Sequence, residues 1–185
     1  MDFFFGNLAF PAIVFYFSIY SFIGWVLENS FSYATGRPFL KDNFLKGPFK
    51  PMYGFAPVLL ILLISPGYPL PIILLLCLLV PTIIEYITGA ILYGVFHLRY
   101  WDYSNERWQL HGHICLNFCA IWLVLSFFTI RFVQPLIALL YESIQQIWVW
   151  FYPTVVLYFG IELVFSLKRH LSRELAEEKE PHPVQ

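Results

Sequence analysis

The chain alternates long apolar runs with short polar connectors, and this pattern predicts its elements. A membrane-spanning helix needs about 20 mostly apolar residues. The apolar runs predict five spans, which are Leu8–Tyr33, Tyr53–Ile64, Leu70–Leu98, Ile114–Arg131 and Ile147–Leu167. Between the last two, Arg131–Gln146 mixes polar and apolar residues at helical spacing, which predicts an amphipathic interfacial helix. We therefore expect an all-α polytopic membrane bundle with about five transmembrane helices plus an interfacial helix.

The second apolar run is unusually short, and the connector before it is rich in proline. The 12 residues of Tyr53–Ile64 rise about 18 Å as a helix, against a hydrocarbon core about 30 Å thick. The connector Thr35–Met52 contains Pro38, Pro48 and Pro51, which prevent a continuous helix. Irregular backbone at membrane depth must be buried in protein or line a wet cavity. The connector is thus either an ordinary loop or a re-entrant segment that forms part of a site.

Composition and charge indicate that the protein lies in a membrane and how it is oriented there. Hydrophobic residues make up 59% of the chain and charged residues only 12%, where a soluble domain has about 25% charged residues. This predicts one transmembrane bundle over residues 1–168 and a charged tail over 169–185, with membrane lipids as neighbours and no nucleic acid as partner. Ten of the 11 Lys and Arg residues fall in the segment Lys168–Gln185 and in the connectors Thr35–Met52 and Arg99–His113, and only Arg131 falls elsewhere. The positive-inside rule then predicts a multi-pass protein of the cytoplasmic membrane with its N-terminus outside and its C-terminus in the cytoplasm.

Three glutamates within the apolar runs are the main candidates for a functional site. Glu85 lies near the middle of its run, one turn after Pro81, whereas Glu28 and Glu162 lie near the ends of theirs. A carboxylate at membrane depth is costly unless it faces the bundle interior, water or a partner. The other spans must therefore supply a partner or water for Glu85.

Other polar residues extend this candidate site. At helical spacing Glu85 and His97 fall near one stripe. Arg99 and Asp102 are three residues apart and are expected to pair, and Asn117 is expected to bridge helices.

The cysteines and clustered histidines suggest no metal centre or cofactor. Cys115 and Cys119 are four residues apart, and His111 and His113 precede them, so a soft-metal site is conceivable. Small buried residues that pack between helices are the better interpretation, because the chain lacks the usual paired Cys and His spacing.

Five ordered motifs resemble those of a known bacterial family. They are Tyr20–Glu28 (YSFIGWVLE), Gly47–Phe55 (GPFKPMYGF), Glu85–Gly89 (EYITG), Arg99–Ser104 (RYWDYS) and Gly112–Leu116 (GHICL). The chain thereby resembles the CmpB-like permease family described as "putative ABC-transporter type IV". Besides Glu28, Glu85 and Asp102, the positions that carry the resemblance are Gly24, Trp25, Gly47, Pro48, Pro51, Tyr53, Gly54, Thr88, Gly89, Trp101, Tyr103, Gly112 and Cys115. The chain departs from the usual family pattern at Lys50, Tyr93 and His113.

The resemblance implies a permease or a transport-associated subunit of an ABC transporter. The chain has no Walker A sequence, so any ATPase would be a separate subunit. One alternative is an intramembrane enzyme that acts on a lipid-linked substrate at the cytoplasmic leaflet. Glu28 or Asp102 would be its base, one of the histidines the partner of that base, and Arg99 a phosphate-binding group. The other alternative is a non-catalytic assembly partner whose polar stripes hold helices together.

Overall fold

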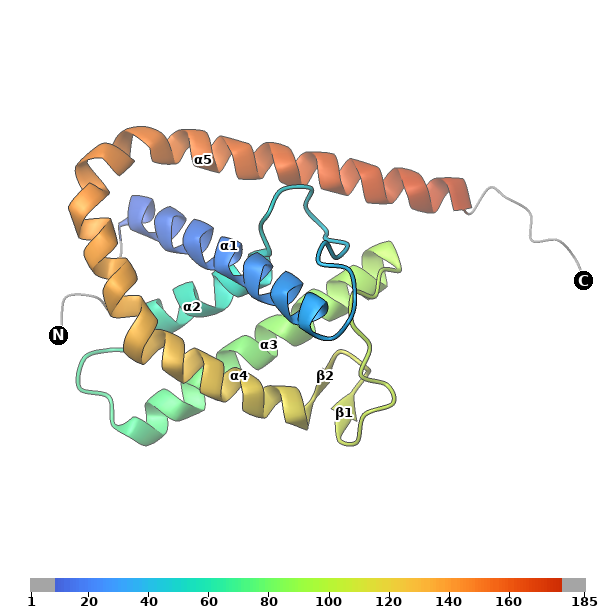
Figure 1. Cartoon of the computed structure of the whole chain (residues 1–185), viewed down its shortest axis with the longest axis horizontal. Helices are drawn as coiled ribbons and strands as arrows, with labels where there is room; N and C mark the ends of the chain where they lie inside the picture. Colours follow the sequence, from blue (N-terminus) through green and yellow to red (C-terminus); the bar gives the residue numbers. More distant parts are fainter. Residues whose placement is uncertain (1–8, 178–185) are drawn as a thin grey trace, which may run out of the picture.

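The computed structural model describes residues 9–177, and nearly all regular structure in this range is helical (Figure 1). The helices are α1 (Phe10–Ala34), α2 (Pro51–Leu63), α3 (Leu70–Phe96), α4 (Leu116–Phe128), the π-helical turn η2 (Thr129–Val133) and α5 (Gln134–Glu177). A short antiparallel pair, β1 (Gln109–Leu110) and β2 (Ile114–Cys115), precedes α4. Cys115 therefore caps α4 from a strand and does not share a helix face with Cys119.

Three helical stretches of the described residues are long and apolar enough to cross a membrane. They are Phe10–Ala34, Leu70–Phe96 and Leu116–Arg173, whereas α2 is a shorter apolar helix. The third stretch has 58 residues, about 87 Å of helix, which is long enough for two crossings. In Figure 1 it runs from the β1–β2 end to the opposite end, bends within the first part of α5, and returns. The structure confirms a membrane-type helical protein and gives three candidate spans where the sequence predicts five.

The predicted interfacial helix is not a separate element. Residues 131–146 continue the helix of α4 through η2, and Gln134, Ile137 and Ala138 are buried. The Tyr20 hydroxyl donates a 2.7 Å hydrogen bond to Gln134 Oε1, so this polar side chain has a partner inside the bundle. Of the four polar residues that give the helical spacing, Gln134 is thus bonded to α1, whereas Glu142, Gln145 and Gln146 are exposed.

Helices α1 and α2 cross closely because glycine is present where they meet. A Cβ at Gly24 would overlap the ring of Tyr53, and a Cβ at Gly54 would overlap Ser21 and Phe17. Small residues let helix backbones approach in this way in membranes. The crossing fixes Tyr53 at the centre of the bundle.

The connector between α1 and α2 enters the bundle. The Lys50 N–H donates a 3.0 Å hydrogen bond to the Ser21 carbonyl. Ser21 lies 13 residues before Ala34, the last residue of α1, and this is about 20 Å along the helix axis. The structure therefore favours the re-entrant alternative for residues 35–50 over an ordinary surface loop.

The two basic connectors and the end of α5 lie toward one end of the molecule. Figure 1 shows the α1–α2 connector, the β1–β2 hairpin and the last turns of α5 there, with the α2–α3 turn at the opposite end. The sequence predicts that both basic connectors and the C-terminus lie on one side of the membrane, and this arrangement is the one that the prediction requires. Helix α5 continues past Lys168 to Glu177 without a break, and residues 178–185 of the predicted tail lie outside the described residues.

Candidate functional site

Glu85 is buried in α3 and receives hydrogen bonds from two other parts of the chain. Its side chain is 2% exposed. The indole N–H of Trp122, on α4, donates to Oε2 at 2.7 Å, and the Tyr103 hydroxyl, from the connector after α3, donates to Oε1 at 3.1 Å. Each carboxylate oxygen thus has a donor, which offsets the cost of a carboxylate at this depth.

The connector after α3 folds back so that Tyr103 reaches Glu85. His97 ends α3 in the left-handed conformation, with φ of 49°. The Tyr103 N–H donates to the Gly112 carbonyl at 3.0 Å, and the Trp101 indole N–H donates to the His113 carbonyl at 2.9 Å. These bonds hold the Arg99–Ser104 motif against the Gly112–Leu116 motif. Burial, together with the nearby Glu85 carboxylate, raises the pKa of Tyr103, so its phenol stays protonated and remains a donor.

A charged cluster closes this connector on its exposed side. Arg99 pairs with Asp102 at 2.9 Å, as the sequence predicts. The Ser104 hydroxyl and N–H both donate to Asp102, and these bonds, with Arg99, lower the pKa of Asp102 to about 2. Gly112, with φ of 73°, lies where a Cβ would touch Ser104 Oγ. The cluster therefore needs glycine at this position, both for its backbone conformation and for space.

The histidines of this connector pack onto α3. A Cβ at Gly89 would lie 3.1 Å from His113 Nδ1, so the ring covers a position that has no side chain. Tyr86 Oη and His111 Nδ1 are 2.9 Å apart. Burial, with the positive charges of Arg99 and His111, lowers the pKa of His113. Three of the five sequence motifs therefore meet around Glu85.

A second charged group forms around Glu28 on α1. Glu28 Oε1 accepts from Lys50 Nζ at 2.6 Å and from Lys41 Nζ at 3.0 Å. The exposed fraction of the side chain is 17% for Glu28 and 10% for Lys50. Tyr53 lies near enough to both Glu28 and Glu85 to feel the charge of each.

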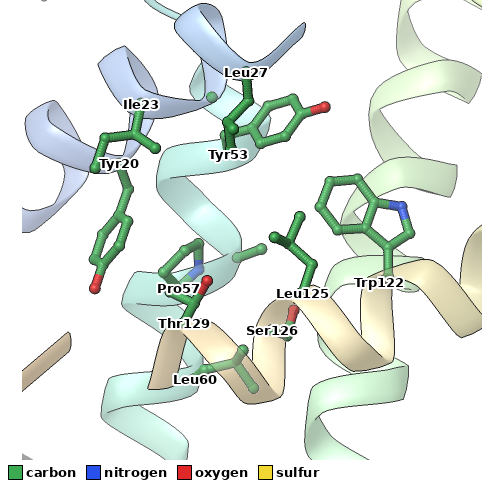
Figure 2. Close-up of a pocket in the computed structure, with 12 residues that line it drawn as sticks. Tyr20, Ile23, Leu27, Tyr53, Pro57, Leu60, Trp122, Leu125, Ser126 and Thr129 are labelled. Atoms are coloured by element: carbon green, nitrogen blue, oxygen red, sulfur yellow. The ribbon is translucent and has the colours of Figure 1, made fainter. Parts of the chain in front are cut away.

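A small pocket is lined in part by Trp122, the residue that donates to Glu85. Its volume is about 40 Å³, and its lining comes from α1, α2, α4 and η2. Figure 2 shows Tyr20 and Trp122 on opposite sides of it, with Ser126 and Thr129 between them. The rings of Tyr53 and Trp122 are 5.3 Å apart. A space of this size admits a few water molecules at most.

Comparison with known proteins identifies the family of the chain. The model of one family, described as "Putative ABC-transporter type IV", matches residues 15–167. The chain belongs to this family. The match covers all five motifs named above, and with them Glu28, Glu85 and Glu162. No match was found among curated proteins or among solved structures.

The structure places Glu162, Asn117 and His97 apart from the contacts around Glu85. The hydrogen bonds of Glu162 join it to neither of the other two glutamates. Its Oε2 accepts from the backbone N–H groups of Lys46 and Gly47, which links the re-entrant connector to α5. Asn117 is exposed in the first turn of α4 and does not bridge buried helix faces. His97 is exposed at the end of α3, outside the buried stripe of Glu85 and Gly89.

The sequence did not predict a site role for two residues that are important in the structure. Trp122 holds Glu85, and Lys41 shares Glu28 with Lys50. The one available signal for Trp122 was its place near the middle of a predicted span, since tryptophan in membrane proteins is enriched at the interfaces.

Proposed function

We propose that this protein is the membrane subunit of an ABC-type transport system, with Glu85 as its functional centre and a separate ATPase as its partner. The observation that carries the proposal is the enclosure of Glu85 by Tyr103 and Trp122, which come from two different segments. Family membership supplies the transporter context. Ionisable groups inside membrane proteins are generally functional, and this one is buried.

The geometry suggests how Glu85 would couple to a conformational change. The ionised carboxylate accepts both donors, one at each oxygen. A protonated carboxyl carries its own O–H donor and is a weaker acceptor than a carboxylate, so both bonds would weaken. Protonation would therefore loosen the hold of Glu85 on Trp122 and Tyr103, and with Tyr103 on the connector that is folded over the bundle.

We place the protein in the bacterial cytoplasmic membrane, with the end that carries both basic connectors in the cytoplasm. The distribution of Lys and Arg supports this orientation. The common end of the connectors in Figure 1 is where a cytoplasmic ATPase would dock.

The test is to purify the tagged chain from native membranes in mild detergent and to assay ATPase activity. We expect a polypeptide with a Walker A sequence to co-purify in stoichiometric amount, with vanadate-sensitive activity. The Glu85→Gln variant keeps the size of the side chain and loses the titration. It should still assemble, with activity reduced about 5-fold or more, the low end of a typical coupling between two sites. The Ile87→Leu variant, at an exposed apolar position of α3, should match the wild type.

The outcomes separate this function from its alternatives. Full activity in the Glu85→Gln complex would remove Glu85 from the coupling. A chain that purifies with no ATPase, while Glu85→Gln disrupts some other complex, would favour the assembly-partner alternative instead.

A further inference from the structure

A cavity of about 350 Å³ lies beside the Glu28–Lys50 pair, and the function proposed above does not use it. Its walls come from the re-entrant connector, α2, α3, the residues after α3 and the second half of α5. The lining is mainly apolar and includes Phe44, Phe55, Leu92 and Phe96. Binding pockets for small ligands start at about 300 Å³ and combine an apolar lining with a few polar groups. This cavity has both properties.

The polar side of the cavity belongs to a cluster of two ammonium groups and one carboxylate. Glu28 and Lys50 line the cavity, and Lys41 joins the cluster from outside the lining. Lys50 and Lys41 donate to the same oxygen of Glu28, so two ammonium groups share one carboxylate. The formal charge of the cluster is therefore positive, and an anionic group beside Lys50 would balance it.

The mouth of the cavity lies on the apolar surface. Ile91 on α3 and Leu163 on α5 line the cavity and are also 52% and 47% exposed. A ligand that enters between these residues arrives from the hydrocarbon side of the molecule. A hydrocarbon chain fits the apolar lining, and an anionic group fits Lys50, a cation of the lining.

We propose that the cavity binds a lipid whose phosphate headgroup carries a net negative charge, with its phosphate at Lys50 and one hydrocarbon chain between α3 and α5. This assignment rests on the proposed transport function, for which it names the chemical class of the transported or regulating molecule. Its measurement does not depend on that function, since binding is tested on the chain without an ATPase.

The test is native mass spectrometry of the full chain in neutral detergent, titrated with dioleoyl phosphatidic acid, dioleoyl phosphatidylcholine or inorganic phosphate. We expect phosphatidic acid to bind at least about tenfold more tightly than phosphatidylcholine, and inorganic phosphate not to compete at equal concentration. The Leu163→Trp variant fills the mouth and should weaken phosphatidic acid binding about tenfold. The Leu157→Trp variant, at a 63% exposed position of α5 outside the lining, is the matched control and should bind like the wild type.

The headgroup contact is tested by two substitutions of Lys50. The Lys50→Gln variant should lose the preference for phosphatidic acid over phosphatidylcholine, and Lys50→Arg should keep it. Equal binding of the two lipids by the wild type, unchanged binding by Leu163→Trp, or full competition by inorganic phosphate would each overturn the proposal. Because Leu163→Trp leaves the charged cluster intact, the test does not depend on the stability of the Lys50 variants.

Discussion

At the scale of single residues, the chain stabilises two buried carboxylates by different means. Glu85 is held by neutral donors, and Glu28 is held by cations. Position in the apolar pattern was enough to select both carboxylates from the sequence. Their partners come from 13 to 37 residues away along the chain, and local periodicity carries no information about contacts of that range.

Substitutions of Glu28 and Lys41 should lower the free energy of unfolding by unequal amounts. The Glu28→Gln variant leaves the buried Lys50 without its counter-charge and should lower the free energy of unfolding by about 3–5 kcal/mol. Lys41 is 32% exposed, so Lys41→Gln should cost about 0–1 kcal/mol. Denaturant titration in detergent, followed by helical circular dichroism, measures both. Equal small losses would show that Lys50 is solvated and that the cluster is not buried.

His113 predicts a pH dependence of stability. Its pKa in the folded protein lies below the ordinary value of about 6.5, because burial and the charges of Arg99 and His111 disfavour the protonated ring. The unfolded chain therefore binds more protons around pH 6, and stability falls as the pH drops through 6.5. We expect Tm to fall between pH 7.5 and pH 5.5, and to fall less in the His113→Gln variant. Identical pH slopes in the two proteins would contradict the burial of this ring.

At the scale of elements, the structure departs from the sequence prediction at residues 131–146. Polar residues at helical spacing predict a surface helix, but Tyr20 provides a buried partner for Gln134. The amphipathic pattern of Arg131–Gln146 could not show that Gln134 is bonded inside the bundle while the polar residues after it are exposed. The strands β1 and β2 were not predicted either, because two residues each are too few for a periodic signal.

The close crossing of α1 and α2 predicts opposite effects for two glycine substitutions. Gly24→Ala forces the ring of Tyr53 to move and should destabilise the protein by about 1–3 kcal/mol. Gly94 lies in α3 with open space around it, so Gly94→Ala should stabilise the protein by up to about 1 kcal/mol through helix propensity. Thermal unfolding of the two variants in the same detergent checks this. A stabilising Gly24→Ala would mean that the helices do not cross here.

At the scale of the whole molecule, composition and charge were sufficient to predict a membrane protein with both basic connectors at one end. The motif resemblance was sufficient to predict the family, which the family model confirms. The meeting of three motifs around Glu85 was beyond the sequence, because it depends on how the connector of residues 97–113 folds back over α3.

The proposed topology predicts which connectors react from outside the cell. In a variant whose native cysteines are replaced, a cysteine at Tyr68, in the α2–α3 turn, should react with a membrane-impermeant maleimide in intact cells. Cysteines at Arg37 and Glu106, in the two basic connectors, should react only after permeabilisation. Labelling of Arg37 and Glu106 from opposite sides would contradict the shared end seen in Figure 1.

The central claim is that Trp122 holds the buried Glu85 carboxylate. The most direct measurement is a double-mutant cycle of Glu85→Gln, Trp122→Phe and the double variant, with unfolding free energies determined in one detergent. The 2.7 Å bond to an ionised group predicts a coupling energy of about 1.5–3 kcal/mol between the two positions. Additive effects within about 0.5 kcal/mol would contradict the claim, because residues that do not share an interaction add in this way.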